Sequence, residues 1–310
     1  MNNCLVTGAT GFIGRSLCHA LQTQGFHVRA LTRRAEMGPW DESFIGDLQD
    51  KAQLTQDLVK GIDTLFHLAG IAHASDGKYS KQEYWTINVE GTRQLVNLAI
   101  EAGVKRFIFF SSVLASNTTS DYGASKKAAE EFILSCAHDH CIEVCILRPA
   151  LVYGPSIKGN LLSMVRAIDR GWFPPVPETK NKRSMVSLSD LIDVAILVAQ
   201  HPAVNRNIYC VTDGKTYSTR QMYDGIRAAL GLKTIHWSIP KGILILLAKL
   251  LDGMSVVLRK TLPFNSKVLD KLLGSAEYSS HALETDLKWK PRLSFYKVLP
   301  DIVSAYKSLN

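Results

Sequence analysis

Five short apolar runs alternate with helical segments over the first half of this chain. The strand-like runs are 4–7, 27–31, 64–68, 106–111 and 143–147, and the helix-like segments between them are 13–24, 51–59, 86–102 and 125–138. Strands and helices that alternate at this length form a parallel sheet with helices on both faces. The unbroken apolar run 107–110 agrees, since a strand buried on both sides has no polar face. The sequence therefore predicts an α/β fold.

A glycine-rich turn follows the first of these strands and opens the first helix. It contains Gly8, Gly11 and Gly14, with Phe12 and Ile13 between the last two. Glycines at this spacing let the backbone approach a pyrophosphate, whose charge then lies at the helix N-terminus. The turn thus predicts a dinucleotide site in a doubly wound sheet of the Rossmann type. The alternative is a glycine-rich turn that binds nothing.

The end of the second strand predicts which dinucleotide binds. An acid usually accepts the ribose hydroxyls of NAD there, but this chain has Thr32, Arg33 and Arg34. Two guanidinium groups can hold a 2′-phosphate, which favours NADP over NAD. Solvated surface arginines are the alternative. Farther along the expected cofactor path, Asp47 and Leu48 are expected to flank the adenine, and 68–70 (Leu68, Ala69, Gly70) to approach the cofactor closely.

Tyr122 and Lys126 are four residues apart and are therefore neighbours on a helix. A free phenol titrates near pH 10, and a nearby ammonium and oxidised nicotinamide would both favour its ionised form. Ser111 and Ser112 end the fourth strand, where either hydroxyl could reach the substrate oxygen, and Ser112 is the favoured residue. Alone, this tyrosine–lysine pair is typical of surface helices. Its place after the fourth strand of a dinucleotide fold favours acid–base catalysis.

After Pro149 the alternation breaks down and prolines mark loops. We expect residues 1–154 to form the dinucleotide-binding domain, with 184–213 returning to it. Residues 155–183 and 214–310 would then form a smaller C-terminal substrate-binding domain.

Composition excludes several functions. The net charge is +8, but the basic residues are scattered and accompany no nucleic-acid motif, so a small anionic ligand is expected instead. The six cysteines form no CxxC pair, and we expect no metal site. Segment 242–251 is too short to cross a bilayer and is expected to be an amphipathic packing helix, with a peripheral membrane contact as the alternative. We expect no cleaved signal peptide and a cytoplasmic location.

These motifs together resemble the extended short-chain dehydrogenase/reductase family of nucleotide-sugar epimerases, dehydratases and reductases. The resemblance covers nearly the whole chain. Its marks are Thr7 through Gly14, His67-Leu68-Ala69-Gly70, Asn88 through Thr92, Ser111-Ser112, Tyr122 through Lys126, Arg148 through Pro155, and Asp286 through Pro291.

The resemblance implies a role for each matching residue. Gly8, Gly11, Phe12 and Ile13 would hold the pyrophosphate, Asp47 and Leu48 the adenine, and Asn88 the nicotinamide half, with Tyr122, Lys126 and Pro149 also beside the cofactor. Ser112, Tyr122 and Lys126 would form the catalytic triad. Ser112, Asn160 and Arg183 would bind the substrate. For Arg183, the alternative is a solvated member of the basic cluster 180–183.

The sequence of segment 154–160 is similar to the corresponding sequence of enzymes that act on UDP-N-acetylhexosamines in surface-polysaccharide synthesis. The resemblance implies hydride transfer at C4 of a UDP-linked sugar. The basic end of the second strand favours a 4-keto-6-deoxy-sugar reductase, and a 4-epimerase with tightly bound NAD is the alternative. Two further alternatives are a non-catalytic NADP sensor and a membrane-associated reductase of small ketones or sterols. The resemblance also suggests a homodimer through the helices at 86–102 and 125–138.

Overall fold

The computed structural model of the chain describes residues 2–71, 79–139, 141–155, 160–202, 204–258 and 265–308. The chain forms two compact units. The first consists of Met1–Ala150, Leu188–Val211 and Ser280–Lys290, and the second of Leu151–Ser187, Thr212–Ser279 and Pro291–Asn310. This division differs from the expected one at four places. Residues 151–154, 184–187 and 212–213 belong to the second unit, where 151–153 pair with 185–187. Residues 280–290 belong to the first unit and pack on its last strand.

A seven-stranded parallel sheet forms the centre of the first unit, in the order β3-β2-β1-β4-β5-β6-β9. Its strands are β1 (Asn3–Thr7), β2 (His27–Thr32), β3 (Glu42–Ile45), β4 (Thr64–His67), β5 (Arg106–Phe110), β6 (Glu143–Pro149) and β9 (Asn207–Val211). The order reverses between β1 and β4, which creates the crevice where such sheets bind ligands. The predicted doubly wound fold is confirmed.

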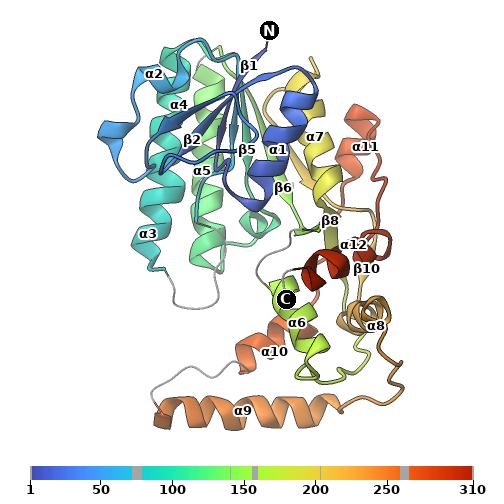
Figure 1. Ribbon diagram of the computed structural model, residues 1–310. Helices are drawn as coiled ribbons and strands as arrows, with labels where there is room; N and C mark the ends of the chain where they lie inside the picture. Colours follow the sequence, from blue (N-terminus) through green and yellow to red (C-terminus); the bar gives the residue numbers. More distant parts are fainter. Residues whose placement is uncertain are drawn as a thin grey trace. The chain divides into compact units, whose positions relative to one another are not determined.

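Helices cover both faces of this sheet (Figure 1). α1 (Phe12–Thr23) and α7 (Leu188–Gln200) lie side by side on one face, and α4 (Gly91–Glu101) and α5 (Asp121–Asp139) pack together on the other. The shorter helical elements are η1 (Lys51–Gln53), α2 (Gln56–Val59), α3 (Lys81–Trp85), η2 (Thr86–Glu90), η3 (Val113–Ser116) and α11 (His281–Leu287). An apolar core lies between the sheet and α4 and α5, and it includes Phe107, Leu95 and Ile133.

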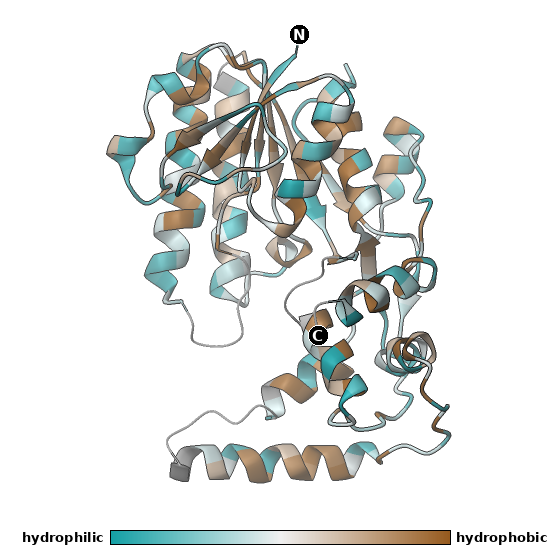
Figure 2. Cartoon of the chain, viewed as in Figure 1, coloured by the Kyte–Doolittle hydropathy of each residue, from teal (hydrophilic) through white to brown (hydrophobic). Residues whose placement is uncertain are grey.

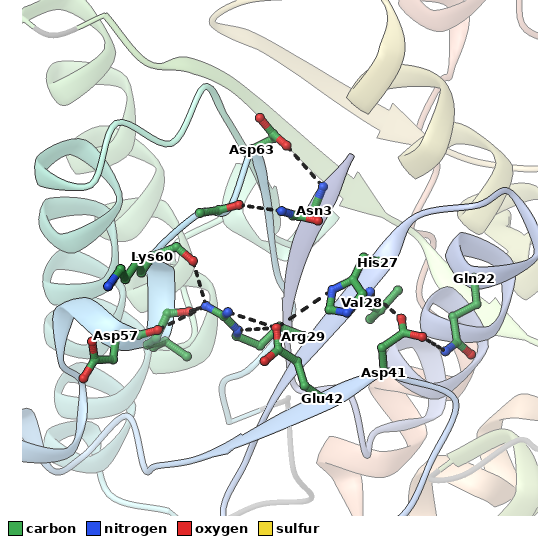
Figure 3. Close-up of polar contacts among 12 residues, drawn as sticks. Asn3, Gln22, His27, Val28, Arg29, Asp41, Glu42, Asp57, Lys60 and Asp63 are labelled. Atoms are coloured by element: carbon green, nitrogen blue, oxygen red, sulfur yellow. Dashed lines mark hydrogen bonds and ion pairs between the residues drawn. The ribbon is translucent and has the colours of Figure 1, made fainter. Parts of the chain in front are cut away.

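Polar contacts tie together the amino ends of the strands, opposite the glycine turn (Figure 3). The guanidinium of Arg29 in β2 donates to the carbonyl oxygens of Asp57, Leu58 and Lys60 at 2.9–3.1 Å. Its Nε also donates to Glu42 in β3 over 2.9 Å. These bonds satisfy the carbonyls that α2 leaves open at its C-terminus, as helix ends require. At this end of the sheet, the polar side chains named here join β2 to β3 and to the end of α2.

The second unit has a small sheet and five helices within its described residues. The strands β7 (Leu151–Tyr153), β8 (Arg183–Ser187) and β10 (Thr216–Tyr217) pair in the order β10-β8-β7. The helices are α6 (Asn160–Asp169), α8 (Thr219–Leu230), α9 (Lys241–Leu258), α10 (Ser266–Leu273) and α12 (Phe295–Lys307). Phe295 anchors this unit, since its buried ring contacts Tyr153 and Tyr217 with centroids 5.5 and 5.7 Å away.

The described residues contain neither a membrane-spanning helix nor a cluster of metal ligands. None of their helices is long and apolar enough to cross a membrane. The described histidine, cysteine, aspartate and glutamate side chains form no group that could hold a metal ion. Among the cysteines, Cys141 is exposed and Cys145 is buried inside β6.

Candidate active site

The glycine turn between β1 and α1 is packed too tightly for side chains. Gly8 has φ 71°, and a Cβ there would lie 2.8 Å from the amide nitrogen of Ala69. A Cβ on Gly14 would lie 2.1 Å from the carbonyl oxygen of Gly8. The amide of Gly11 donates to that same oxygen over 3.0 Å and closes the turn. The backbone therefore runs directly past the first turn of α1, as a close approach to a ligand requires.

The N-terminus of α1 presents backbone donors. Gly11 is its N-cap, and no side chain among the described residues caps the helix. The first amides of a helix have no partner within it, and they carry the positive end of the helix dipole. Phe12 and Ile13 occupy this first turn. A pyrophosphate fits these donors and this turn, so the residues present fit a dinucleotide.

The second strand ends beside this turn. Thr32, its last residue, is 3% exposed, and its hydroxyl has no hydrogen-bond partner among the described residues. Arg33 and Arg34 follow it and are exposed. The nearest acid along the chain, Glu36, forms an ion pair with Arg15 of α1. A buried hydroxyl without a partner is uncommon and is expected where a ligand supplies the missing bond.

Asp47 and Leu48 follow β3. Asp47 is half-buried, and its carboxylate accepts the amide of Gln49 over 3.0 Å. Leu48 is buried against the start of α4, where a Cβ on Gly91 would lie 3.0 Å from the Leu48 Cβ. The backbone of this segment is thus fixed, since the amide of Asp47 also donates to Gln53 over 3.0 Å.

A buried histidine holds the turn after β4. Thr92 donates its hydroxyl to the carbonyl of Asn88 over 2.8 Å, so it accepts the Nε2 proton of His67, also over 2.8 Å. The Nδ1 of His67 then accepts the hydroxyl of Thr7 over 2.7 Å, and the Thr7 oxygen accepts the amide of Ala69 over 3.1 Å. The network assigns His67 to its neutral Nε2 tautomer. Burial lowers the pKa of His67 to about 3, and the charge of Lys126 contributes.

A π turn, η2, places Asn88 between this loop and α5. The Asn88 amide pairs with the backbone of Ile71, accepting its N–H over 2.8 Å and donating to its carbonyl over 3.2 Å. It also donates to the hydroxyl of Ser125 over 3.0 Å. A Cβ on Gly70 would lie 2.7 Å from Asn88 Oδ1 and 3.7 Å from Lys126 Nζ. The structure therefore brings Leu68, Ala69, Gly70, Asn88 and Lys126 together. Single π turns of this kind often occur at functional sites.

Tyr122 and Lys126 both lie on α5, because this helix begins at Asp121 rather than at 125 as predicted. Tyr122 is hydrogen-bonded to Ser112, which follows β5. The Ser112 oxygen is itself held by the amide of Leu114 over 3.2 Å. Lys126 is buried and donates to the carbonyl of Phe110 over 2.9 Å. The three predicted catalytic residues thus gather at the carboxyl edge of the sheet.

Burial opposes charge on both of these ionisable groups. It raises the pKa of Tyr122 to about 12, while the hydrogen bond with Ser112 lowers it and the neighbouring Tyr84 raises it further. Burial also lowers the pKa of Lys126 to about 8, and the carboxylate of Glu130 raises it. Tyr122 is therefore a neutral phenol in the protein alone. A base at this position needs further positive charge nearby.

Sequence reasoning missed a buried ion pair behind the catalytic helix. Glu130, one turn after Lys126, is fully buried and accepts hydrogen bonds from Nε and Nη2 of Arg148 over 2.8 and 2.5 Å. Ser111 also donates to Glu130 over 2.5 Å, and Arg148 donates to Ser116 over 2.9 Å. Pro149 follows Arg148 and is buried at the end of β6. This network fixes α5 to β5 and β6 and so fixes the helix that carries Tyr122.

Two residues of the second unit, Asn160 and Arg183, are expected to bind substrate, and the structure gives side-chain contacts for Arg183. Asn160 starts α6, and its side chain lies outside the described residues. The guanidinium of Arg183 contacts the carbonyl oxygens of Lys271 and Gly274 at the C-terminus of α10. A cation there is favoured by the helix dipole. Arg183 is thus held by its own unit rather than solvated.

Comparison with known proteins identifies the family. Residues 4–211 match the model of the NAD dependent epimerase/dehydratase family. The chain is also 31% identical over 328 residues to UDP-glucose 4-epimerase of Vibrio cholerae, which covers 99% of this chain and 96% of that protein. The chain belongs to the NAD dependent epimerase/dehydratase family. The predicted family is thereby confirmed, and with it the prediction of an enzyme.

Two further similarities are more distant. The chain is 27% identical over 260 residues to the N-acetyl-alpha-D-glucosaminyl-diphospho-ditrans,octacis-undecaprenol 4-epimerase of Escherichia coli O157:H7, covering 78% of this chain and 77% of that protein. The structure of MoeE5 in complex with UDP-glucuronic acid and NAD superposes with a TM-score of 0.78 at 23% identity, covering 99% of this chain and all of that one. That structure shares the fold of this chain.

Proposed function

We propose that this chain is a nucleotide-sugar 4-epimerase, which oxidises and re-reduces C4 of a UDP-linked sugar or N-acetylamino sugar. The observation that carries the proposal is the hydrogen-bonded pair Ser112 and Tyr122, one helical turn from the buried Lys126 and at the same edge of the sheet as the uncapped α1. Two of the relatives that the chain matches are 4-epimerases by name, and one of them acts on a UDP-sugar.

Each catalytic side chain has a role that its position supports. A bound NAD would supply the hydride acceptor and donor at C4 and add a positive charge beside Tyr122. Tyr122 takes the proton of the 4-hydroxyl and returns it when C4 is reduced from the opposite face. Ser112 donates a hydrogen bond to the same oxygen. The ammonium of Lys126 favours the phenolate, as an opposite charge nearby does.

The remaining predicted residues would bind cofactor and substrate. Gly8, Gly11, Phe12 and Ile13 would hold the pyrophosphate, Asp47 and Leu48 the adenine, and Leu68, Ala69, Gly70, Asn88 and Pro149 the nicotinamide half. The first unit would thus be the cofactor domain. The second unit would be the substrate domain, where Asn160 and Arg183 contact the diphosphate. A planar, permanently charged guanidinium suits phosphate binding.

The direct test supplies UDP-glucose or UDP-N-acetylglucosamine to the purified protein and follows the 4-epimer by nuclear magnetic resonance. Replacing Tyr122 with Phe should abolish turnover and leave cofactor binding nearly unchanged. Tyr84→Phe is the matched control, because Tyr84 is equally buried and its ring centre lies 6.0 Å from that of Tyr122. A Tyr122→Phe enzyme at wild-type rate would refute the assignment. Binding of dinucleotide without turnover of any sugar would favour the sensor.

A second candidate function is the NADPH-dependent reduction of a 4-keto-6-deoxy sugar. The exposed pair Arg33 and Arg34 at the end of β2 favours it, since two guanidinium groups suit a 2′-phosphate. Replacing both arginines with Ala should weaken NADP binding at least tenfold and leave NAD binding unchanged. If wild type binds NADP no better than NAD, or if NAD co-purifies tightly, the reductase loses its support.

We also propose a homodimer that assembles through α4 and α5. Leu98 on α4 and Phe132 on α5 are only partly buried within the chain and would be covered by a partner. Light scattering of the purified protein should give twice the chain mass, and a Leu98→Asp variant should give the monomer. A monomeric wild type would end this proposal.

A further inference from the structure

The long helix α9 turns a continuous apolar face to solvent. Ile243, Leu246, Leu247, Leu250 and Met254 are 43–59% exposed. They recur every three or four residues, so they lie in one stripe along the helix. Figure 2 shows this helix as one of the most hydrophobic in the chain. A surface helix of a globular protein normally has polar residues on this side.

The opposite face of α9 already has its partner. Leu244 and Ala248 are fully buried and pack on Leu269 of α10. Asp252, the acid of this helix, is directed to the same side and accepts the amide of Ser266 at the start of α10. The exposed stripe is therefore not the face that folds against the second unit. An apolar patch of this kind marks a binding surface.

The charge around the stripe is positive. Lys241 and Lys249 of α9 are exposed, as is Lys233 before it, and Asp252 is the single acid in segment 233–258. Trp237, just before α9, is 63% exposed. Ile239, two residues later, donates its amide to the carbonyl of Pro175 over 2.9 Å and so connects this segment to the rest of the second unit. Lysines and a tryptophan beside an aliphatic stripe are typical of helices that lie in a membrane interface.

We propose that the exposed face of α9 binds the surface of an anionic lipid bilayer, with the helix axis parallel to the membrane. The aliphatic side chains would enter the boundary between headgroups and acyl chains, while Lys241 and Lys249 contact the anionic headgroups. A second copy of the chain fits less well, because a stable dimer uses roughly 20–30 residues a side and this stripe offers five. This surface belongs to the second unit, whereas the proposed catalytic residues belong to the first.

The test is sedimentation of the full chain with vesicles of phosphatidylcholine, with and without phosphatidylglycerol. We expect binding to the anionic vesicles that weakens as salt rises, and much weaker binding to phosphatidylcholine alone. Leu246→Asp with Leu250→Asp should weaken binding at least tenfold while turnover of soluble substrate is retained. Lys241→Gln with Lys249→Gln should weaken binding to the anionic vesicles specifically.

A matched control carries two aspartates on exposed apolar positions of the first unit. Met37 and Ile45 are 94% and 56% exposed, and Met37→Asp with Ile45→Asp should bind vesicles as wild type does. The proposal is overturned if wild type does not sediment with anionic vesicles, or if the Leu246/Leu250 variant binds as well as wild type. It is also overturned if that variant instead turns a wild-type dimer into monomers without affecting sedimentation. Sedimentation does not depend on catalysis, so its result is independent of the proposed function.

Discussion

The ammonium of Lys126 donates a hydrogen bond over 2.9 Å to the carbonyl oxygen of Phe110, the last residue of β5. It also lies 4.5 Å from the ring centre of Phe109. Lys126 thus connects the catalytic helix to the carboxyl edge of the sheet and keeps a cation one turn from Tyr122. Because this ammonium is buried, its pKa is lowered to about 8.

The first prediction follows from that pKa. The unfolded chain titrates this lysine near 10.4, so between pH 8 and 10.4 the unfolded state binds more protons and the contribution of Lys126 to stability rises with pH. Relative to Lys126→Met, wild type should gain about 3 kcal/mol of unfolding free energy from pH 7.5 to 10.5. Urea unfolding at both pH values measures this. Lys127 is half-exposed on the same helix, so the difference in unfolding free energy between wild type and Lys127→Met should change far less between the two pH values.

The second prediction concerns the buried neutral His67. Its pKa of about 3 in the folded protein lies below the ordinary value, so the unfolded state binds more protons as the pH falls from 6.5 to 3. Stability is therefore lost over that range. Between pH 7 and 4.5, wild type should lose about 3 kcal/mol more unfolding free energy than His67→Gln. Equal losses in the two proteins would show that His67 is protonated in the fold.

Much of the first unit could be predicted from local pattern. Its buried strands are continuous apolar runs, as Phe107 through Phe110 illustrate. The glycines at 8, 11 and 14 are spaced as a tight turn between strand and helix needs, and the structure has this turn. The edge strand β3 could not be predicted, because its residues Glu42 to Ile45 are mostly exposed and have no apolar face. The sequence predicts a later start for α5 than the structure has, because Tyr122 and Gly123 are poor helix formers, a preference that packing overrides.

The supporting contacts could not be predicted, because they join residues far apart in the chain. Glu130 stands in a run that looks like a solvated helix face, and only the fold brings Arg148 to it. The contacts of His67 with Thr7 and Thr92 span 60 and 25 residues. Likewise, nothing near Arg183 in the sequence indicates the end of α10. Asp286 lies in a family motif, and the structure shows it accepting the hydroxyl of Tyr209 over 3.1 Å.

The third prediction tests the tight turn. Gly14→Ala would place a methyl group 2.1 Å from the backbone oxygen of Gly8, where no flexible side chain can yield. The variant should lose about 1–3 kcal/mol of stability, as overpacked sites do, and bind dinucleotide at least tenfold more weakly. Dinucleotide binding can be followed by isothermal titration. Gly253→Ala on α9 is the control, since nothing lies within 4 Å of its added methyl group and the helix should gain stability. Unchanged dinucleotide binding by Gly14→Ala would mean that the turn does not approach the cofactor.

The fourth prediction concerns the buried pair Glu130 and Arg148. Arg148→Met leaves a fully buried carboxylate without its cation, which should cost about 3–5 kcal/mol of unfolding free energy in urea. Replacing both residues together, Glu130→Leu with Arg148→Met, should cost less than the single change, because the charge is removed with its partner. Lys182→Met, which breaks an exposed pair with Glu277 at 3.2 Å, should cost about 0–1 kcal/mol. Glu130→Leu alone completes the comparison. If the losses of the two single variants add up to the loss of the double variant, the two side chains act independently, and the pair is not what holds the catalytic helix on the sheet.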